Sequence, residues 1–211
     1  MLVLKKMPFF RQKGYQLALP EHEAFNNLPP TGQDLEREQK QRLFSIFQEQ
    51  VFHPAHYQAG LKALSGASAL MPEVCRRFRK MHQDWGFVLY PHYQVVLTLY
   101  GPGGYYLPRS GKIVILTTKE GRFIRRDPLH TVVHEMVHLG VHRMLESKYR
   151  LRHWEKERLV DLICQLKLGD LLPGYRMQPK GNKALDPFTN KETLADIPSA
   201  LEQYLSRHPR P

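Results

Sequence analysis

Two histidines and a glutamate in the spacing of a metal site form the part of the sequence best suited to chemistry. The stretch TVVHEMVHLGVH at 131–142 places His134, Glu135 and His138 in the pattern H-E-x-x-H. On an α-helix, residues four apart lie on one face, so two imidazoles in this pattern can bind a single Zn²⁺. Glu135 lies about 100° further round the helix, where it can reach a metal-bound water without occupying a metal position. The motif therefore predicts two zinc ligands beside a general base.

The abundance of histidine allows a second interpretation of this segment. The chain has 11 histidines, and His130, His134, His138 and His142 recur every four residues. Such a row is also typical of a solvated face on an amphipathic helix, so a third ligand has to decide between the two interpretations. His142 is poorly placed for that role, because eight helical residues from His134 correspond to about 12 Å along the axis. The pattern H-E-x-x-H-x-x-G-x-x-H, in which the chain turns back at a glycine, is also missing from the sequence.

A second acidic pattern follows in the segment HWEKERLVDLICQ at 153–165. Glu157 comes after 18 intervening residues from His138, and Asp161 follows four residues later on the same helical face. Glu155 is a competing ligand candidate, but it has no acid four residues after it. The alternative for these acids is a solvated charged face. The whole pattern is H-E-x-x-H, 18 residues, and then E-x-x-x-D.

This combined pattern resembles the gluzincin zinc metallopeptidases, which include the thermolysin-like and aminopeptidase families. The resemblance implies that Glu157 is the third zinc ligand and that Asp161 orients a ligand histidine from behind, as carboxylates near metal-bound histidines usually do. It covers about 50 residues, from the strand expected at Lys112 to the end of the helix near Leu168. In size the chain is closer to the small minigluzincins than to the larger members. The G-x-M-E-N motif of aminopeptidases is missing, which argues against aminopeptidase activity.

The resemblance also implies a mechanism and two further features of the site. One Zn²⁺ per chain would be held by three residues, and Glu135 would act as general base toward the attacking water. Gluzincins bind extended peptide on an edge strand upstream of the motif, and KIVILTT at 112–118 is the natural candidate. A Tyr or His donor usually supports the oxyanion in such enzymes, and Tyr175, Tyr204 and His208 are three candidates among which the sequence does not choose.

The elements that must position these residues can be predicted from periodicity and end signals. Asp127 and Pro128 suit the N-cap and first position of a helix that runs to about Glu146. A second helix is expected at about 153–168, and a last one at about 194–206. Strands are expected at 87–101 and at 112–118, with a sharp glycine turn at 101–104. Upstream, helices are expected from a cap at 31–34 onward and again before and after Gly66, with Pro72 in the first turn of the last of these.

These elements predict an α+β fold of zincin-like type, with a small mixed or antiparallel sheet, an active-site helix and a following helix that bears a ligand. We expect an N-terminal arm or loop at 1–33, a helical subdomain at 34–85 and the metallopeptidase domain at 86–211. A single domain throughout is the alternative, because 211 residues fit one domain with an extension.

Composition and charge limit the classes of protein that fit. No run approaches the roughly 18 apolar residues of a membrane-spanning helix, and Lys5 and Lys6 interrupt the N-terminal apolar run before a secretory signal can form. We therefore expect a cytoplasmic protein without membrane insertion. The resemblance implies that it acts on a peptide or protein substrate. The net charge is +11, so a basic nucleic-acid-binding protein with incidental histidines is the alternative from another class. A zinc hydrolase for a non-peptide substrate is the alternative within the enzymes.

Overall fold

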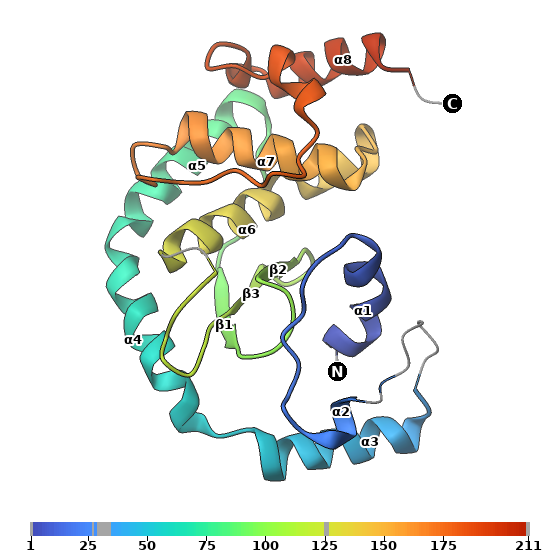
Figure 1. Cartoon of the computed structure of the whole chain (residues 1–211). Helices are drawn as coiled ribbons and strands as arrows, with labels where there is room; N and C mark the ends of the chain where they lie inside the picture. The colour runs from blue at the N-terminus through green and yellow to red at the C-terminus, as the bar shows by residue number, and fades with distance from the viewer. Residues whose placement is uncertain (1, 27, 29–34, 125–126, 210–211) are drawn as a thin grey trace.

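The chain folds as the predicted α+β class. The computed structural model describes residues 2–26, 28, 35–124 and 127–209, and that part holds eight α-helices and a three-stranded mixed sheet (Figure 1). The α-helices are α1 (Leu2–Gln12), α2 (Glu23–Asn26), α3 (Arg37–Ile46), α4 (Gln58–Gly66), α5 (Met71–Trp85), α6 (Pro128–Arg143), α7 (His153–Lys167) and α8 (Ile197–Arg207). The shorter 3₁₀ and π segments are η1 (Phe47–Val51), η2 (Pro54–Tyr57), η3 (Ala67–Leu70), η4 (Met144–Lys148), η5 (Lys183–Phe188) and η6 (Thr193–Ala195). The strands are β1 (Gln94–Thr98), β2 (Gly104–Leu107) and β3 (Lys112–Leu116).

The sheet places the strand expected to bind substrate in its centre. The strand order is β1-β3-β2, with β1 parallel and β2 antiparallel to β3. Ile113, Val114 and Ile115 of β3 are buried, because a continuous apolar run is stable only where neighbours cover both faces. The prediction that 112–118 is an edge strand was therefore wrong. The edge strand beside the helix of the motif is β2. Its first residue, Gly104, lies in the predicted glycine turn, and its other three residues lie where no element was predicted.

Helix α6 lies at the centre of the molecule, between the sheet and α7, and α8 covers the far side of α7 (Figure 1). Its predicted start is confirmed, since the Asp127 side chain accepts a hydrogen bond from the Leu129 N–H at 2.8 Å and Pro128 stands in the first turn. All residues from Pro128 to Val141 are buried. A helix enclosed on every side is a rigid mount for functional side chains.

Close packing fixes α6 against α5 and the segment that follows it. A Cβ on Gly140 would lie 1.9 Å from Cζ of Phe87, so only glycine fits there. The Phe87 ring is fully buried and stacks on Phe78 at 4.7 Å between centroids. The Val88 N–H donates to the Gly140 carbonyl at 2.8 Å. The position of α6 along its axis is thus set by a ring that has no room to move.

The N-terminal residues, expected to form an arm or loop, contain α1 and α2 and pack on the rest of the molecule. Met7 and Phe10 of α1 are buried, and Ala18 forms an antiparallel bridge with Gly101 through hydrogen bonds of 2.7 and 3.0 Å. Figure 1 shows α1 beside β2.

Other predicted boundaries shift by a few residues. The helix cap expected at 31–34 lies outside the described residues, and α3 begins after Glu36, which hydrogen-bonds through its N–H to the Gln39 side chain at 3.0 Å. The strand expected at 87–101 is limited to β1. Pro72 stands in the first turn of α5 as predicted. None of the helices in the described ranges has the length and apolar character that crossing a membrane requires.

Candidate metal centre

Three buried side chains converge between α6 and α7. His134 and His138 come from one face of α6, and Glu157 comes from α7. The His134 and His138 Nε2 atoms are 3.1 Å apart, and Glu157 Oε2 lies 3.4 and 3.3 Å from them. Ligand atoms of a tetrahedral zinc site with bonds of 2.0–2.1 Å are about 3.3 Å apart. This group can hold a metal ion, and its spacing matches three corners of such a tetrahedron.

A carboxylate and a phenol hold His134 from the side opposite the cluster. The Tyr175 hydroxyl donates to Asp161 Oδ1 at 2.7 Å and lies 2.7 Å from His134 Nδ1. Asp161 Oδ1 itself is 3.3 Å from His134 Nδ1. Since the phenol proton goes to Asp161, His134 Nδ1–H donates to the phenol oxygen, which leaves the Nε2 lone pair for a metal. Asp161 thus stands where the resemblance implied, with Tyr175 as an intermediary that the sequence did not suggest.

The charges of both acids are stabilised despite their burial. Burial by itself raises the pKa of Glu157, but His138 and His134 hold that pKa well below its usual value. Burial also tends to raise the pKa of Asp161. His134, the Tyr175 hydroxyl and the Gln178 N–H lower that pKa below its usual value. The Gln178 N–H donates to Asp161 Oδ2 at 2.6 Å, and its side-chain amide donates to Glu157 Oε2. Both side chains are therefore carboxylates, the form that a metal ligand and its partner need.

The two competing ligand candidates are engaged elsewhere. Glu155 accepts hydrogen bonds from the Arg152 N–H at 2.6 Å and from the Tyr204 hydroxyl at 2.8 Å, which places it at the start of α7 facing α8. His142 Nδ1 lies 3.2 Å from the Tyr106 hydroxyl, beyond the cluster along α6. Neither belongs to the group of three.

Glu135 lies beside the cluster and against strand β2. It is 7% exposed, and a Cβ on Gly104 would stand 2.8 Å from its Oε1. Glycine at the first position of β2 thus gives the carboxylate its space next to the strand. Two residues further along the strand, Tyr106 stacks on the His138 ring at 5.0 Å with an interplanar angle of 12°.

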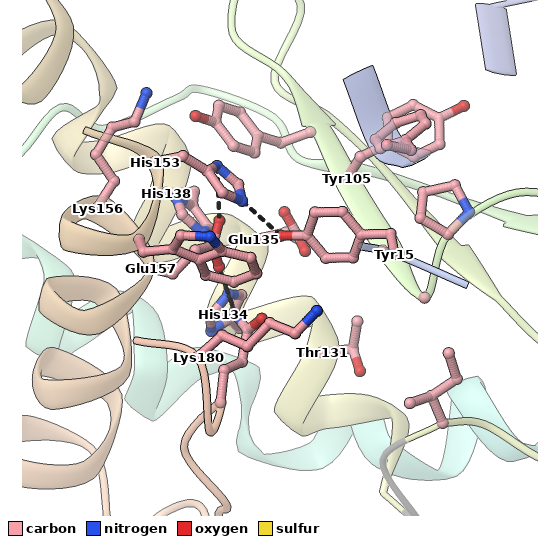
Figure 2. A pocket seen from close by; sticks show the side chains of 18 of the residues that line it. Tyr15, Tyr105, Thr131, His134, Glu135, His138, His153, Lys156, Glu157 and Lys180 are labelled. Atoms are coloured by element: carbon pink, nitrogen blue, oxygen red, sulfur yellow. Dashed lines mark hydrogen bonds and ion pairs between the residues drawn. The ribbon is translucent and has the colours of Figure 1, made fainter. Parts of the chain in front are cut away.

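The N-terminal segment contributes a phenol that no sequence pattern predicted at this site. Tyr15 extends toward the cluster near Glu135 (Figure 2), and its hydroxyl is hydrogen-bonded to His153 Nε2 at 2.9 Å. His153 is one helical turn before Glu157, with Nδ1 3.9 Å from Glu157 Oε1. Burial and the negative charges of Glu157 and Glu135 raise the pKa of Tyr15, so the phenol stays protonated. Burial lowers the pKa of His153, which favours a neutral ring.

Tyr175, Tyr204 and His208 were the three sequence candidates for oxyanion support, and the structure places each of them away from the cleft. Tyr175 lies behind His134, Tyr204 hydrogen-bonds to Glu155, and the ring of His208 stacks on Tyr204 at 4.5 Å. None of them is among the described residues that line the cleft. They follow α7 in the sequence, whereas Tyr15 precedes the motif by more than 100 residues, so its proximity depends on tertiary structure alone.

The cluster lies at the bottom of a cleft of about 700 Å³. Its walls are β2, the face of α6 from Thr131 to His142, the start of α7, the 176–180 segment and residues 6–16 of the N-terminal segment. Phe9 and Ile124 line it although they are 44% and 69% exposed. Accessible apolar side chains above a buried polar cluster are typical of ligand-binding clefts.

The chain matches no protein-family model, no curated protein and no solved structure. Inference about its function therefore depends on the chemistry of this cleft.

Proposed function

We propose that this protein is a zinc-dependent peptidase of the gluzincin type. The observation that supports it best is the triangle of donor atoms from His134, His138 and Glu157, with sides of 3.1–3.4 Å, next to the carboxylate of Glu135. Two imidazoles and one carboxylate suit Zn²⁺, and three protein ligands leave a fourth position open for chemistry.

Each residue then has a defined role in hydrolysis. A zinc ion at this site supplies Lewis acidity, which polarises a carbonyl group and lowers the pKa of water. Glu135 takes a proton from the attacking water and delivers it to the leaving amine. Asp161 and Tyr175 hold His134 in the tautomer that keeps Nε2 available.

Tyr15 is the donor that this proposal assigns to the carbonyl oxygen of the substrate. His153 Nε2–H can donate to the Tyr15 oxygen, which leaves the phenol O–H free to point into the cleft. A fixed donor beside a developing negative charge stabilises the transition state more than the ground state. The high pKa of Tyr15 supports this role, because the donor keeps its proton at every working pH.

The edge of β2 favours a peptide as the substrate. The Leu116 N–H of β3 donates to the Gly103 carbonyl at 2.9 Å, so the main-chain groups of Tyr105 and Leu107 also face β3. Those of Gly104 and Tyr106 face the outer edge, since alternate residues of an antiparallel strand point in opposite directions. An extended peptide can pair with them as an added strand, next to Glu135.

Metal analysis and peptide hydrolysis together test the proposal. Protein purified without added metal should contain about one zinc per chain, and the zinc-loaded protein should cleave a mixture of unstructured peptides, as detected by mass spectrometry. Glu135→Gln should keep the zinc and lose hydrolysis by several orders of magnitude. A protein that takes up no zinc, or a Glu135→Gln variant as active as the parent, would refute the proposal.

A further inference from the structure

Four cationic side chains line the cleft, and they come from three separate parts of the chain. Lys6 belongs to α1, Lys156 to α7, and Arg176 and Lys180 to the segment after α7. The acids lining the cleft in the described part of the chain are Glu135, Glu146 and Glu157. Lys156 forms an ion pair with Glu146, and a divalent metal would more than offset Glu157. Lys6 and Lys180 alone therefore outweigh Glu135, the remaining acid of the three, and the metal-loaded cleft has a positive potential that attracts anionic groups.

Contacts on two sides fix the position of Lys180. Its Nζ donates to the Gly14 carbonyl at 3.2 Å and lies 5.7 Å from the centre of the Trp154 ring. An ammonium group has three N–H donors, and the Gly14 carbonyl accepts one. Figure 2 shows the Lys180 side chain extending into the cleft. It starts only two residues after Gln178, whose side chain contacts Glu157.

The N-terminal segment also closes one end of the peptide groove. Ala18 occupies the pairing position at Gly101 through two main-chain hydrogen bonds, so an added strand on β2 cannot continue past that residue. Gly101 lies three positions before Gly104, and strand residues rise about 3.3 Å each. A peptide that passes Glu135 toward this end therefore has room for about two or three residues.

Charge decides which end of a peptide suits the closed end. A peptide antiparallel to β2 directs its C-terminal residues toward Gly101, and a parallel peptide directs its ammonium end there. The cations of the cleft repel an ammonium group and pair with a carboxylate. We propose that Lys180, with Lys6 and Arg176, forms a subsite that binds a carboxylate of the substrate. That carboxylate is either the C-terminus of a short peptide or an acidic side chain. This inference rests on the proposed function, because it takes the groove along β2 as the peptide site.

Peptide binding to the zinc-loaded Glu135→Gln protein tests the subsite separately from hydrolysis. The probes are four pools of fluorescein-labelled hexapeptides with neutral random positions. The first ends in a free carboxylate and the second in an amide. The third and fourth also end in an amide and contain a fixed Glu or a fixed Gln. The free-acid pool should bind about fivefold more tightly than the amide pool, as expected for a partly exposed charge pair.

Variants of the cations then identify the subsite. Lys180→Met should remove most of the preference for the free-acid pool over the amide pool, and Lys180→Arg should keep that preference. Lys62→Met, which removes an exposed lysine of α4 outside the cleft, should leave it unchanged. If the fixed-Glu pool binds as tightly as the free-acid pool and the fixed-Gln pool does not, the carboxylate comes from a side chain.

Equal binding of all four pools, no binding of any pool, or an unchanged preference in Lys180→Met would overturn the proposal. The test of the carboxylate subsite can be told apart from the test of peptidase activity. Cleavage of all pools at one rate by the wild type would retain the peptidase without the subsite. A carboxylate preference in a protein that cleaves nothing would retain the subsite without the peptidase.

Discussion

Glu157 and Asp161 lie one turn apart on α7, but they face different partners. Glu157 Oε2 is within 3.4 Å of both histidine Nε2 atoms, whereas Asp161 lies near His134 alone of the two histidines, at Nδ1, the nitrogen that faces away from the cluster. We predict that Glu157→Ala empties the zinc site and that Asp161→Ala weakens zinc binding about 10- to 100-fold. Titration with zinc against a competing chelator measures both effects.

The matched controls for that series are one acid and one histidine that lie nearby but face away from the cluster. Glu155→Gln and His142→Ala should keep near-normal zinc affinity, because Glu155 hydrogen-bonds to Tyr204 and His142 to Tyr106. If His142→Ala emptied the site and Glu157→Ala did not, the metal would be bound in another geometry and the gluzincin assignment would fail.

Tyr15 permits a test of transition-state stabilisation with little change in packing. Tyr15→Phe keeps the ring that lies 5.8 Å from Trp154 and removes only the hydroxyl. We predict a loss of about 10²–10³ in kcat, the usual effect of removing one oxyanion donor, with KM and zinc content nearly unchanged. An increase in KM at constant kcat would instead assign Tyr15 to substrate binding.

The sequence predicted the residues of the cluster because their spacing lies within two helices. His134, Glu135 and His138 share one helix, and the regular geometry of a helix converts their spacing into positions. The acid pattern of the next helix supplied Glu157 and Asp161 through a resemblance. Tyr15, His153 and Lys180 have no such local relation. They meet only because α1 packs beside β2, and no sequence pattern encodes that contact.

At the scale of elements, α6 depends on one glycine. Gly140→Ala would place a methyl group 1.9–2.3 Å from three atoms of the Phe87 ring, which stacks on Phe78 and cannot shift. We predict a loss of about 1–3 kcal/mol in the free energy of unfolding, measured by urea denaturation. Gly66→Ala, at the end of α4 with nothing within 4 Å of the new methyl, should be neutral or stabilising by up to about 1 kcal/mol. Equal effects of the two changes would show that Phe87 does not restrict α6.

The elements predicted correctly are those with strong local signals, and the missed ones have weak signals. Asp127 and Pro128 mark the start of α6, and a continuous apolar run marks β3. Strand β2 has four residues and begins with a glycine after a Gly-Pro-Gly turn, so its strand character comes from pairing with β3. Helix α1 contains Pro8 and is stabilised by burial of Met7 and Phe10. The resemblance implied that 112–118 is an edge strand. Strand order depends on which strands pair, and a single sequence does not show that pairing.

For the whole molecule, a bound metal would link α6 to α7. Any ligand that binds only the folded state stabilises it by about 2.7 kcal/mol at a hundredfold excess over Kd. For a chain of this size, that corresponds to about 5–10 °C in Tm. We predict a decrease of this size when zinc is removed with a chelator, measured by scanning calorimetry. Glu157→Ala should show no response to chelator, and a wild-type Tm that stays constant while zinc is lost would contradict the linkage.

Trp154 gives this cleft an optical reporter. The chain has two tryptophans, and the other, Trp85, packs edge-on against the buried ring of Phe87 at 5.7 Å. Trp154 instead lies beside Tyr15 and Lys180, two other side chains that line the cleft. A Trp85→Phe protein would therefore emit only from the cleft. Its fluorescence intensity would follow a peptide as it enters, before any bond is broken.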